Sequence, residues 1–242
     1  MRVVRTKPRR SRHRSPLPFV LVNMAITADG KIATANRAIS SFGSDRDHEH
    51  LLELRSTADA VMSGARTVDS AKINLGPGGI KFQRRRLRRG LAEFNLRVVA
   101  SRSASVNPNA EVFRRQFSPV IVLVSRRALR ARIARLRDVA NEVRIFGGLE
   151  IDLDAALRWL RTEWGVKRLL CEGGAELNDA LFRAGLVNEV HLTVCPRIFG
   201  GRQAPTISDG TGFPNLADAA RLRLKSWKRV GAELFLVYSV QN

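Results

Sequence analysis

The stretch LLCEGGAELNDAL, residues 169–181, joins an apolar run to a helix-like pattern through an acid and two adjacent glycines. Glycine costs backbone entropy inside a helix or strand, so a pair at such a junction serves a tight turn or lets another group approach the main chain. The helix that follows presents unpaired N–H groups, which favour an anion. We therefore expect Gly173 and Gly174 to form a strand-to-helix turn that faces an anionic ligand.

On both sides of this stretch, short apolar runs alternate with helical patterns. Continuous apolar runs suit strands buried on both faces, so the pattern predicts an α/β fold with a central, mostly parallel sheet covered by helices. Helical spacing and closing glycines predict helices that end at Gly165 and Gly185, and a further helix lies within 44–56. The predicted strands are 19–26, 59–64, 96–101, 119–125, 142–147 and 166–173.

The last quarter of the chain changes character. Longer strand patterns cover 187–199, 221–231 and 232–240, and the last two predict a terminal antiparallel hairpin. Residues 71–93 and 200–216 carry glycine and proline without periodicity, so we expect long surface loops there.

The composition fits one large domain, which we expect to span 19–242. The chain has 242 residues, 44% of them hydrophobic, and can bury a full core. No apolar run reaches the roughly 18 residues of a membrane helix, and the N-terminus lacks the apolar stretch of a secretory signal. Its two cysteines are too few for a disulfide framework or a cysteine metal site. These features predict a cytoplasmic protein without membrane or metal sites.

The formal charge of +20 raises the question of nucleic-acid binding. Residues 1–18 hold seven Lys and Arg without an acid, and residues 81–89 hold six more. We expect the tail 1–18 to be disordered, because like charges and prolines offer no surface to bury. No DNA- or RNA-binding signature accompanies these runs, so nucleic acid is expected to bind only weakly and non-specifically through the tail. A functional contact with a polyanion is the alternative.

The segment MSGARTVDSA, residues 62–71, repeats the glycine pattern. Gly64 ends a predicted strand, and Arg66 and Thr67 fall in the first turn of a short helix. Two such junctions in one sheet can grip both phosphate regions of a dinucleotide, whereas two ordinary tight turns are the alternative. Neither junction matches G-x-G-x-x-G or the P-loop, which disfavours an ordinary Rossmann domain or nucleoside triphosphatase.

An arginine occupies an unexpected place in the helix within 44–56. Helical spacing puts His48, Leu51, Leu52 and Arg55 on the stripe that faces the sheet. Arg55 can bond the last carbonyls of its own helix, or it can reach a pocket and hold an anionic group. Position alone leaves both readings open.

Two long segments resemble a known family. VNMAITADGKIA with LLELRSTADAVMSGARTV, and LLCEGGAELNDALFRAGLVNEVHLTVCPRIFGG, are similar to the riboflavin-biosynthesis pyrimidine reductase family. The resemblance implies the three-layer fold of dihydrofolate reductase, here as a stand-alone reductase. It also implies that NADPH reduces the ribosylamino side chain of 5-amino-6-(5-phosphoribosylamino)uracil, a small phosphorylated pyrimidine, to the ribitylamino form.

The resemblance also implies roles for individual residues. Asp29 becomes a catalytic candidate at the substrate end, with an Asp-Gly turn as the alternative. Arg55 matches an arginine that contacts substrate, which favours the phosphate-binding reading of that residue. Glu172 matches an acid beside the substrate and a candidate proton relay, with a structural bond to backbone N–H groups as the alternative. The positions matched to NADPH contacts are Gly64, Thr67, Gly173, Gly174, Ala175, Glu176 and Leu177.

The sequence departs from the family pattern after Thr67. An aspartate of the family is replaced by Ala71, a substrate arginine by glycine, and a lysine of the first strand by Asn23. These departures leave open a related NADPH reductase with a pterin-like or other pyrimidine substrate, or a basic nucleic-acid-binding protein on the same scaffold. Family analogy and the long C-terminal strands imply a homodimer.

Overall fold

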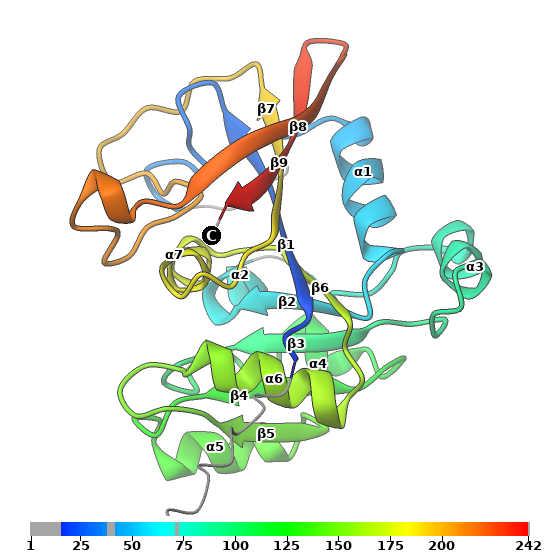
Figure 1. Cartoon of the computed structure of the whole chain (residues 1–242). Helices are drawn as coiled ribbons and strands as arrows, with labels where there is room; N and C mark the ends of the chain where they lie inside the picture. Colours follow the sequence, from blue (N-terminus) through cyan, green and yellow to red (C-terminus); the bar gives the residue numbers. More distant parts are fainter. Residues whose placement is uncertain (1–15, 38–41, 71–72, 242) are drawn as a thin grey trace, which may run out of the picture.

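The computed structural model describes residues 16–37, 42–70 and 73–241. Within these ranges, nine strands form one sheet in the order β5-β4-β3-β2-β6-β1-β7-β9-β8 (Figure 1). The strands are β1 (Phe19–Thr27), β2 (Ala60–Gly64), β3 (Leu96–Ala100), β4 (Val120–Val124), β5 (Glu142–Ile145), β6 (Arg168–Cys171), β7 (Glu189–Cys195), β8 (Arg221–Val230) and β9 (Glu233–Gln241).

The sheet is parallel from β5 to β7, and β1 pairs with both β6 and β7 in that orientation. Strand β9 then pairs antiparallel with β7, and β8 pairs antiparallel with β9. The predicted mostly parallel sheet with a C-terminal antiparallel hairpin is therefore confirmed. The carboxyl ends of the parallel strands lie along one edge of the sheet, and open α/β sheets bind their ligands at this edge.

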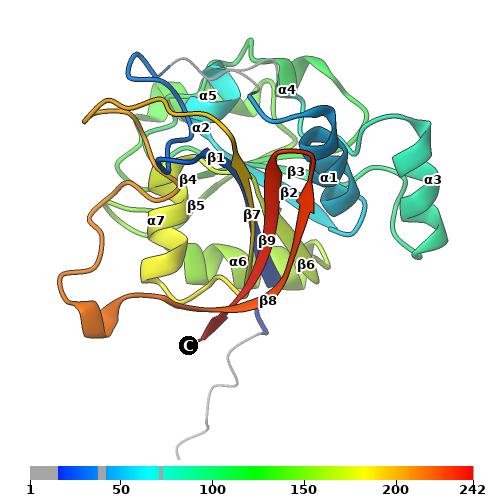
Figure 2. The ribbon, with the colours of Figure 1, turned by 90° about the horizontal axis from the view of Figure 1, so that it is seen from above.

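Helices cover both faces of the sheet and make three layers (Figure 2). Strand β1 shows the alternation: Val20 and Val22 pack in one cluster with residues of α6 and α7, whereas Leu21 packs on the opposite face with residues of α1, α2, α4 and α5. The helices are α1 (Asp45–Arg55), α2 (Ala65–Ser70), α3 (Ile80–Arg88), α4 (Glu111–Arg114), α5 (Arg130–Arg137), α6 (Leu153–Glu163), α7 (Ala175–Arg183) and the 3₁₀ turn η1 (Leu216–Asp218).

The loop expected over 71–93 is a wrong prediction, because α3 lies within it. Its basic residues dock on α1: Lys81 pairs with Glu49, and Arg85 Nη1 lies 3.0 Å from Glu53 Oε1. Arg86 is 1% exposed and donates 2.8 Å to the carbonyl of Arg55. These partners come from another helix, so local periodicity could not predict α3. Much of the basic run 81–89 therefore binds α1.

The remaining helices agree in part with the sequence predictions. Helices α4 and α5 were not predicted, whereas α6 and α7 end before Gly165 and Gly185, which both have positive φ. Residues 1–15 of the predicted disordered tail, and Ala71, lie outside the described residues. Among the described residues, no helix combines the length and the hydrophobicity of a membrane-spanning segment.

Candidate active site

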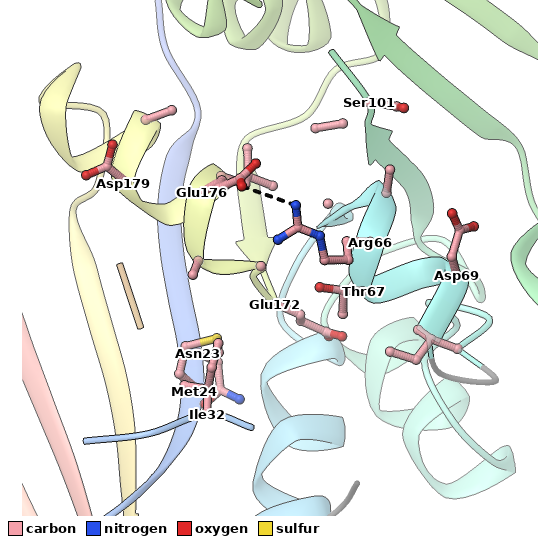
Figure 3. Close-up of a pocket in the computed structure, with 18 of the residues that line it drawn as sticks. Asn23, Met24, Ile32, Arg66, Thr67, Asp69, Ser101, Glu172, Glu176 and Asp179 are labelled. Atoms are coloured by element: carbon pink, nitrogen blue, oxygen red, sulfur yellow. Dashed lines mark hydrogen bonds and ion pairs between the residues drawn. The ribbon is translucent and has the colours of Figure 1, made fainter. Parts of the chain in front are cut away.

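A cavity of about 2080 Å³ opens at the carboxyl ends of the parallel strands (Figure 3). It is lined by residues of β1, α1, α2 and α7 and by the loops after α2, β3 and β6. A pocket for one small ligand usually measures about 300 to 1,000 Å³. The cavity therefore has room for a dinucleotide and a second, smaller molecule together.

The two glycine junctions face each other at this cavity. The Gly64 N–H donates to the carbonyl of Gly173 over 2.8 Å. A Cβ atom added at Gly64 would lie 3.2 Å from the Gly174 nitrogen, and one added at Gly174 would lie 3.0 Å from Thr67 Oγ1. Gly173 has φ +86°, a conformation that favours glycine. Ser63 Oγ also donates to the Gly173 carbonyl over 3.1 Å, so the structure brings together segments that lie 110 positions apart in the sequence.

The amino terminus of α7 begins at this contact. Gly174 is its N-cap and provides no side-chain bond to the first turn, so the backbone N–H groups there need another partner. Gly174, Ala175, Glu176 and Leu177 line the cavity, whereas Gly173 is not among the lining residues. Across the opening, Arg66 Nη2 lies 3.2 Å from Glu176 Oε1, and both side chains are exposed. This arrangement provides donors for an anionic ligand.

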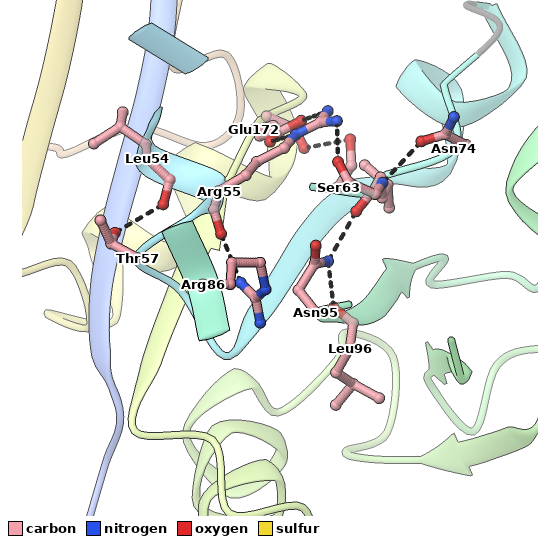
Figure 4. A network of polar contacts seen from close by, with 12 residues as sticks. Leu54, Arg55, Thr57, Ser63, Asn74, Arg86, Asn95, Leu96 and Glu172 are labelled. Atoms are coloured by element: carbon pink, nitrogen blue, oxygen red, sulfur yellow. Dashed lines mark hydrogen bonds and ion pairs between the residues drawn. The ribbon is translucent and has the colours of Figure 1, made fainter. Parts of the chain in front are cut away.

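Arg55 and Glu172 form a buried ion pair at the same cavity (Figure 4). Arg55 Nε and Nη2 each lie 2.6 Å from a Glu172 oxygen, and Nη1 donates to the Gly76 carbonyl over 2.6 Å. The two side chains are 10% and 9% exposed. The reading of Arg55 as a cap of its own helix is wrong, because its guanidinium bonds other elements. Glu172 binds a side chain rather than nearby backbone amides.

Asp29 does not join this group. Its carboxylate accepts bonds from Thr27 Oγ1 at 2.5 Å, Phe199 N at 3.2 Å and Gly200 N at 2.7 Å. The Thr27 hydrogen bond is the main cause that lowers the pKa of this carboxyl. Asp29 is not among the residues that line the cavity, and Gly30 beside it has φ +79°. These contacts favour the Asp-Gly turn, and the catalytic role of Asp29 stays a prediction.

Two polar residues of the cavity were missed as site candidates. Asn23 on β1 and Asp47 on α1 both line it. Among the described residues, Asn23 Oδ1 is buried and has no hydrogen-bond partner, whereas the Asp47 carboxylate lies beside the Thr193 hydroxyl and Glu233. Burial raises the pKa of the Asp47 carboxyl above its usual value. Asp47 reads in sequence as an ordinary acid of a first helical turn, so only the packing of α1 on the sheet reveals its position.

Comparison with known proteins identifies the family. The RibD C-terminal domain matches residues 18–236. The chain belongs to this family. A 2,5-diamino-6-ribosylamino-4(3H)-pyrimidinone 5′-phosphate reductase of Methanothermobacter thermautotrophicus is 36% identical over 93% of this chain and 99% of its own. A riboflavin biosynthesis protein RibD of Actinobacillus pleuropneumoniae is 28% identical over 92% of this chain and 57% of its own.

A solved structure shows the same fold. A pyrimidine reductase-like protein of Corynebacterium diphtheriae superposes with a TM-score of 0.75 at 22% identity, over 93% of this chain and 92% of that one. The resemblance to pyrimidine reductases, and with it the dihydrofolate-reductase-like fold class, is confirmed. As a member of the RibD C-terminal domain family, this chain carries its glycine junctions and the Arg55–Glu172 pair inside the matched region. Within the described ranges, no group of three or more His, Cys, Asp or Glu could hold a metal ion.

Proposed function

We propose that this chain reduces 2,5-diamino-6-ribosylamino-4(3H)-pyrimidinone 5′-phosphate with NADPH, and so belongs to riboflavin biosynthesis. The observation that carries the proposal is the 36% identity, over almost the whole of both chains, to a reductase of that name. The uracil expected from the sequence differs at ring position 2, where it carries oxygen in place of the amino group. A cytoplasmic location remains part of this proposal.

The cavity fits a nicotinamide dinucleotide. Bare backbone at Gly64 and Gly174 allows phosphates to reach the uncapped amino terminus of α7, and any side chain at Gly174 would crowd Thr67. Arg66 on α2 and Arg102 after β3 line the cavity and are candidates for a 2′-phosphate, which favours NADPH over NADH. When bound, NADPH supplies the hydride that reduces C1′ of the ribosyl group.

Arg55 and Glu172 would then act at the substrate. The bidentate pair fixes the orientation of the Glu172 carboxylate, which suits it to stabilise the positive iminium charge that forms at C1′ as the sugar ring opens, while the ring oxygen takes its proton from solvent. Three bonds of Arg55 are directed at Glu172 and Gly76, and the guanidinium has further N–H groups that can donate to the substrate phosphate. The walls of the cavity would hold the reacting groups in register.

Asn23 and Asp47 suit the pyrimidine ring. The ring of the diamino substrate presents two neighbouring donors, the 2-amino group and N3–H, and a carboxylate accepts such a pair. The 2-oxo group of the uracil would face the same carboxylate with a second acceptor. Because Asp47 lines the cavity from α1, we assign to this residue the preference for the diamino ring.

The test compares substrates and variants. The fall of NADPH absorbance is followed with the diamino pyrimidinone phosphate, the uracil phosphate and dihydrofolate. We expect turnover of the diamino compound, and Asp47→Asn should shift the ratio of kcat/KM toward the uracil by about ten-fold or more, since an amide can donate to the 2-oxo group. Turnover of dihydrofolate alone would contradict the proposal. An unchanged ratio in Asp47→Asn would leave the function standing and remove the role of Asp47.

We also propose a homodimer. The outer strand β8 has no neighbour on its free edge among the described residues, and it exposes Leu222 at 44%, Leu224 at 48% and Trp227 at 64%. Exposed apolar side chains gathered on one edge hairpin favour an interface. A second copy is the occupant that family analogy suggests.

A further inference from the structure

Residues 204–212 form a strap along one wall of the cavity, between the segment after β1 and helix α7. Pro205, Asp209, Gly210 and Thr211 of this strap line the cavity. At one end it is tied to the segment after β1: the Ile32 N–H donates to the Pro205 carbonyl over 2.9 Å, and β-type pairing joins residues 31 and 206. The strap therefore starts on the wall that also contains Ile32.

At its other end the strap is tied to α7. The Asp209 N–H donates to the Ala175 carbonyl over 3.2 Å, and Asn178 Nδ2 donates to the Ile207 carbonyl over 2.8 Å. The last contact is made by Asp179, whose Oδ1 accepts the Gly212 N–H at 3.1 Å. These bonds hold the strap beside Gly174 and Ala175, the proposed position of the cofactor phosphates.

Asp179 is an unusual residue for its place in the helix. It is 2% exposed, and a buried carboxylate is costly unless it is paired. Its Oδ2 lies 2.8 Å from Arg183 Nε, which supplies the charge partner, and its Oδ1 is left for the strap. Gly210 packs directly against it, since an added Cβ there would overlap the Asp179 carboxylate. The contact leaves no space for a side chain at position 210.

We propose that Asp179 is a positioning residue that pins the strap against α7 and thereby forms the wall of the cofactor-phosphate site. The inference rests on the proposed NADPH-dependent function. The strap touches the first turn of α7 at Ala175 and closes the cavity on that side. A released strap would leave the phosphates exposed to water, so cofactor binding should weaken while the chemical step is unchanged in the saturated enzyme.

The experiment measures KM for NADPH, kcat, and the dissociation constant of NADPH by nucleotide fluorescence. In Asp179→Ala we expect both KM and the dissociation constant to rise by about ten-fold, with kcat within about two-fold of the unchanged protein. Asp179→Asn should recover most of the affinity, because its amide oxygen can accept the Gly212 N–H. Hydrogen exchange of the backbone amides of residues 206–212 should be faster in Asp179→Ala than in Asp179→Asn.

Asp59→Ala is the matched control. Asp59 also accepts two backbone amides, those of Lys167 and Arg168, both at 2.8 Å, but it does not line the cavity. The Asp59→Ala variant should be less stable to unfolding but should bind NADPH with unchanged affinity. Gly210→Ala displaces the same strap by overlap, so it should match Asp179→Ala, and the double variant should be no more than about two-fold worse than either single variant.

The outcomes separate this inference from the function on which it rests. Faster hydrogen exchange in the strap with unchanged NADPH affinity overturns the positioning role. Full additivity of Asp179→Ala and Gly210→Ala in their effects on the dissociation constant of NADPH overturns it as well. If Asp179→Ala does not fold, Gly210→Ala decides by the same measurements. A protein that binds NADPH but reduces none of the three test substrates contradicts the proposed function, and the dissociation constants still test the strap.

Discussion

Replacing Arg55 by methionine, alone and together with Glu172→Leu, separates the stability of the ion pair from its function. The single change leaves a carboxylate that is 9% exposed without its partner, and it removes the donor to the Gly76 carbonyl. Breaking a buried pair from one side costs about 3 to 5 kcal/mol. For a domain of this size, that corresponds to a fall in Tm of about 6 to 20 °C.

The double variant should behave differently in the two assays. Replacing both charges by apolar side chains of similar volume is often neutral for stability, so Tm should return to near that of the unchanged protein. Activity should not return, because the substrate loses a charge-assisted contact. We expect kcat/KM to stay lower by about ten- to a hundred-fold.

Thermal unfolding and NADPH oxidation with the diamino substrate measure the two effects. Arg55→Lys serves as the intermediate case, and it should recover only part of the activity, since one ammonium cannot reproduce the bidentate fork. A single Arg55→Met variant with unchanged Tm would refute the energetic reasoning. A stable double variant with full kcat/KM would show that the pair only supports the fold.

Three further outcomes are expected. Gly174→Val should raise the dissociation constant of NADPH by more than about ten-fold in a folded protein, because a Cβ atom there already lies 3.0 Å from Thr67 Oγ1. Gly148→Ala is the control, because a Cβ atom at Gly148 meets no atom within 4 Å. Equal NADPH affinities of the Gly174→Val variant and the unchanged protein would reject the phosphate placement. Burial, with His191 and Lys228 nearby, lowers the pKa of His50 to about 4 from 6.5. The free energy of unfolding should therefore fall as the pH drops from 6.5 to 4, because the imidazole of His50 binds a proton in the unfolded chain but not in the folded protein. In urea unfolding, His50→Gln should make the free energy of unfolding depend less on pH over this range. An equally steep pH dependence in the variant would exclude His50 as its source. Sedimentation at micromolar concentration should show twice the 26.9 kDa of one chain, and Trp227→Glu should yield single chains; a 26.9 kDa species in the unchanged protein would contradict the dimer.

The local pattern of the sequence was enough to predict the layered fold. Continuous apolar runs such as those of β1 and β4 are informative because strands buried on both faces need no alternation. The glycines at 173 and 174 are equally informative, because only a bare backbone suits a crowded junction with positive φ. Each of these signals is contained within a few consecutive residues, so each predicts local structure without any knowledge of tertiary contacts.

Tertiary structure decided how the residues that line the cavity pair with one another. Arg55 and Glu172 are 117 positions apart, and no spacing rule predicts that the Arg55 guanidinium donates hydrogen bonds to the Glu172 carboxylate. The same holds for α3, whose basic residues look like a solvated loop until α1 supplies carboxylates and carbonyls. Asp47 and Asp179 read as ordinary helix acids, and Asp29 reads as a catalytic one. Which acid faces a ligand depends on how helices pack on the sheet, and that packing is set by apolar contacts throughout the core rather than by the residues that flank each acid.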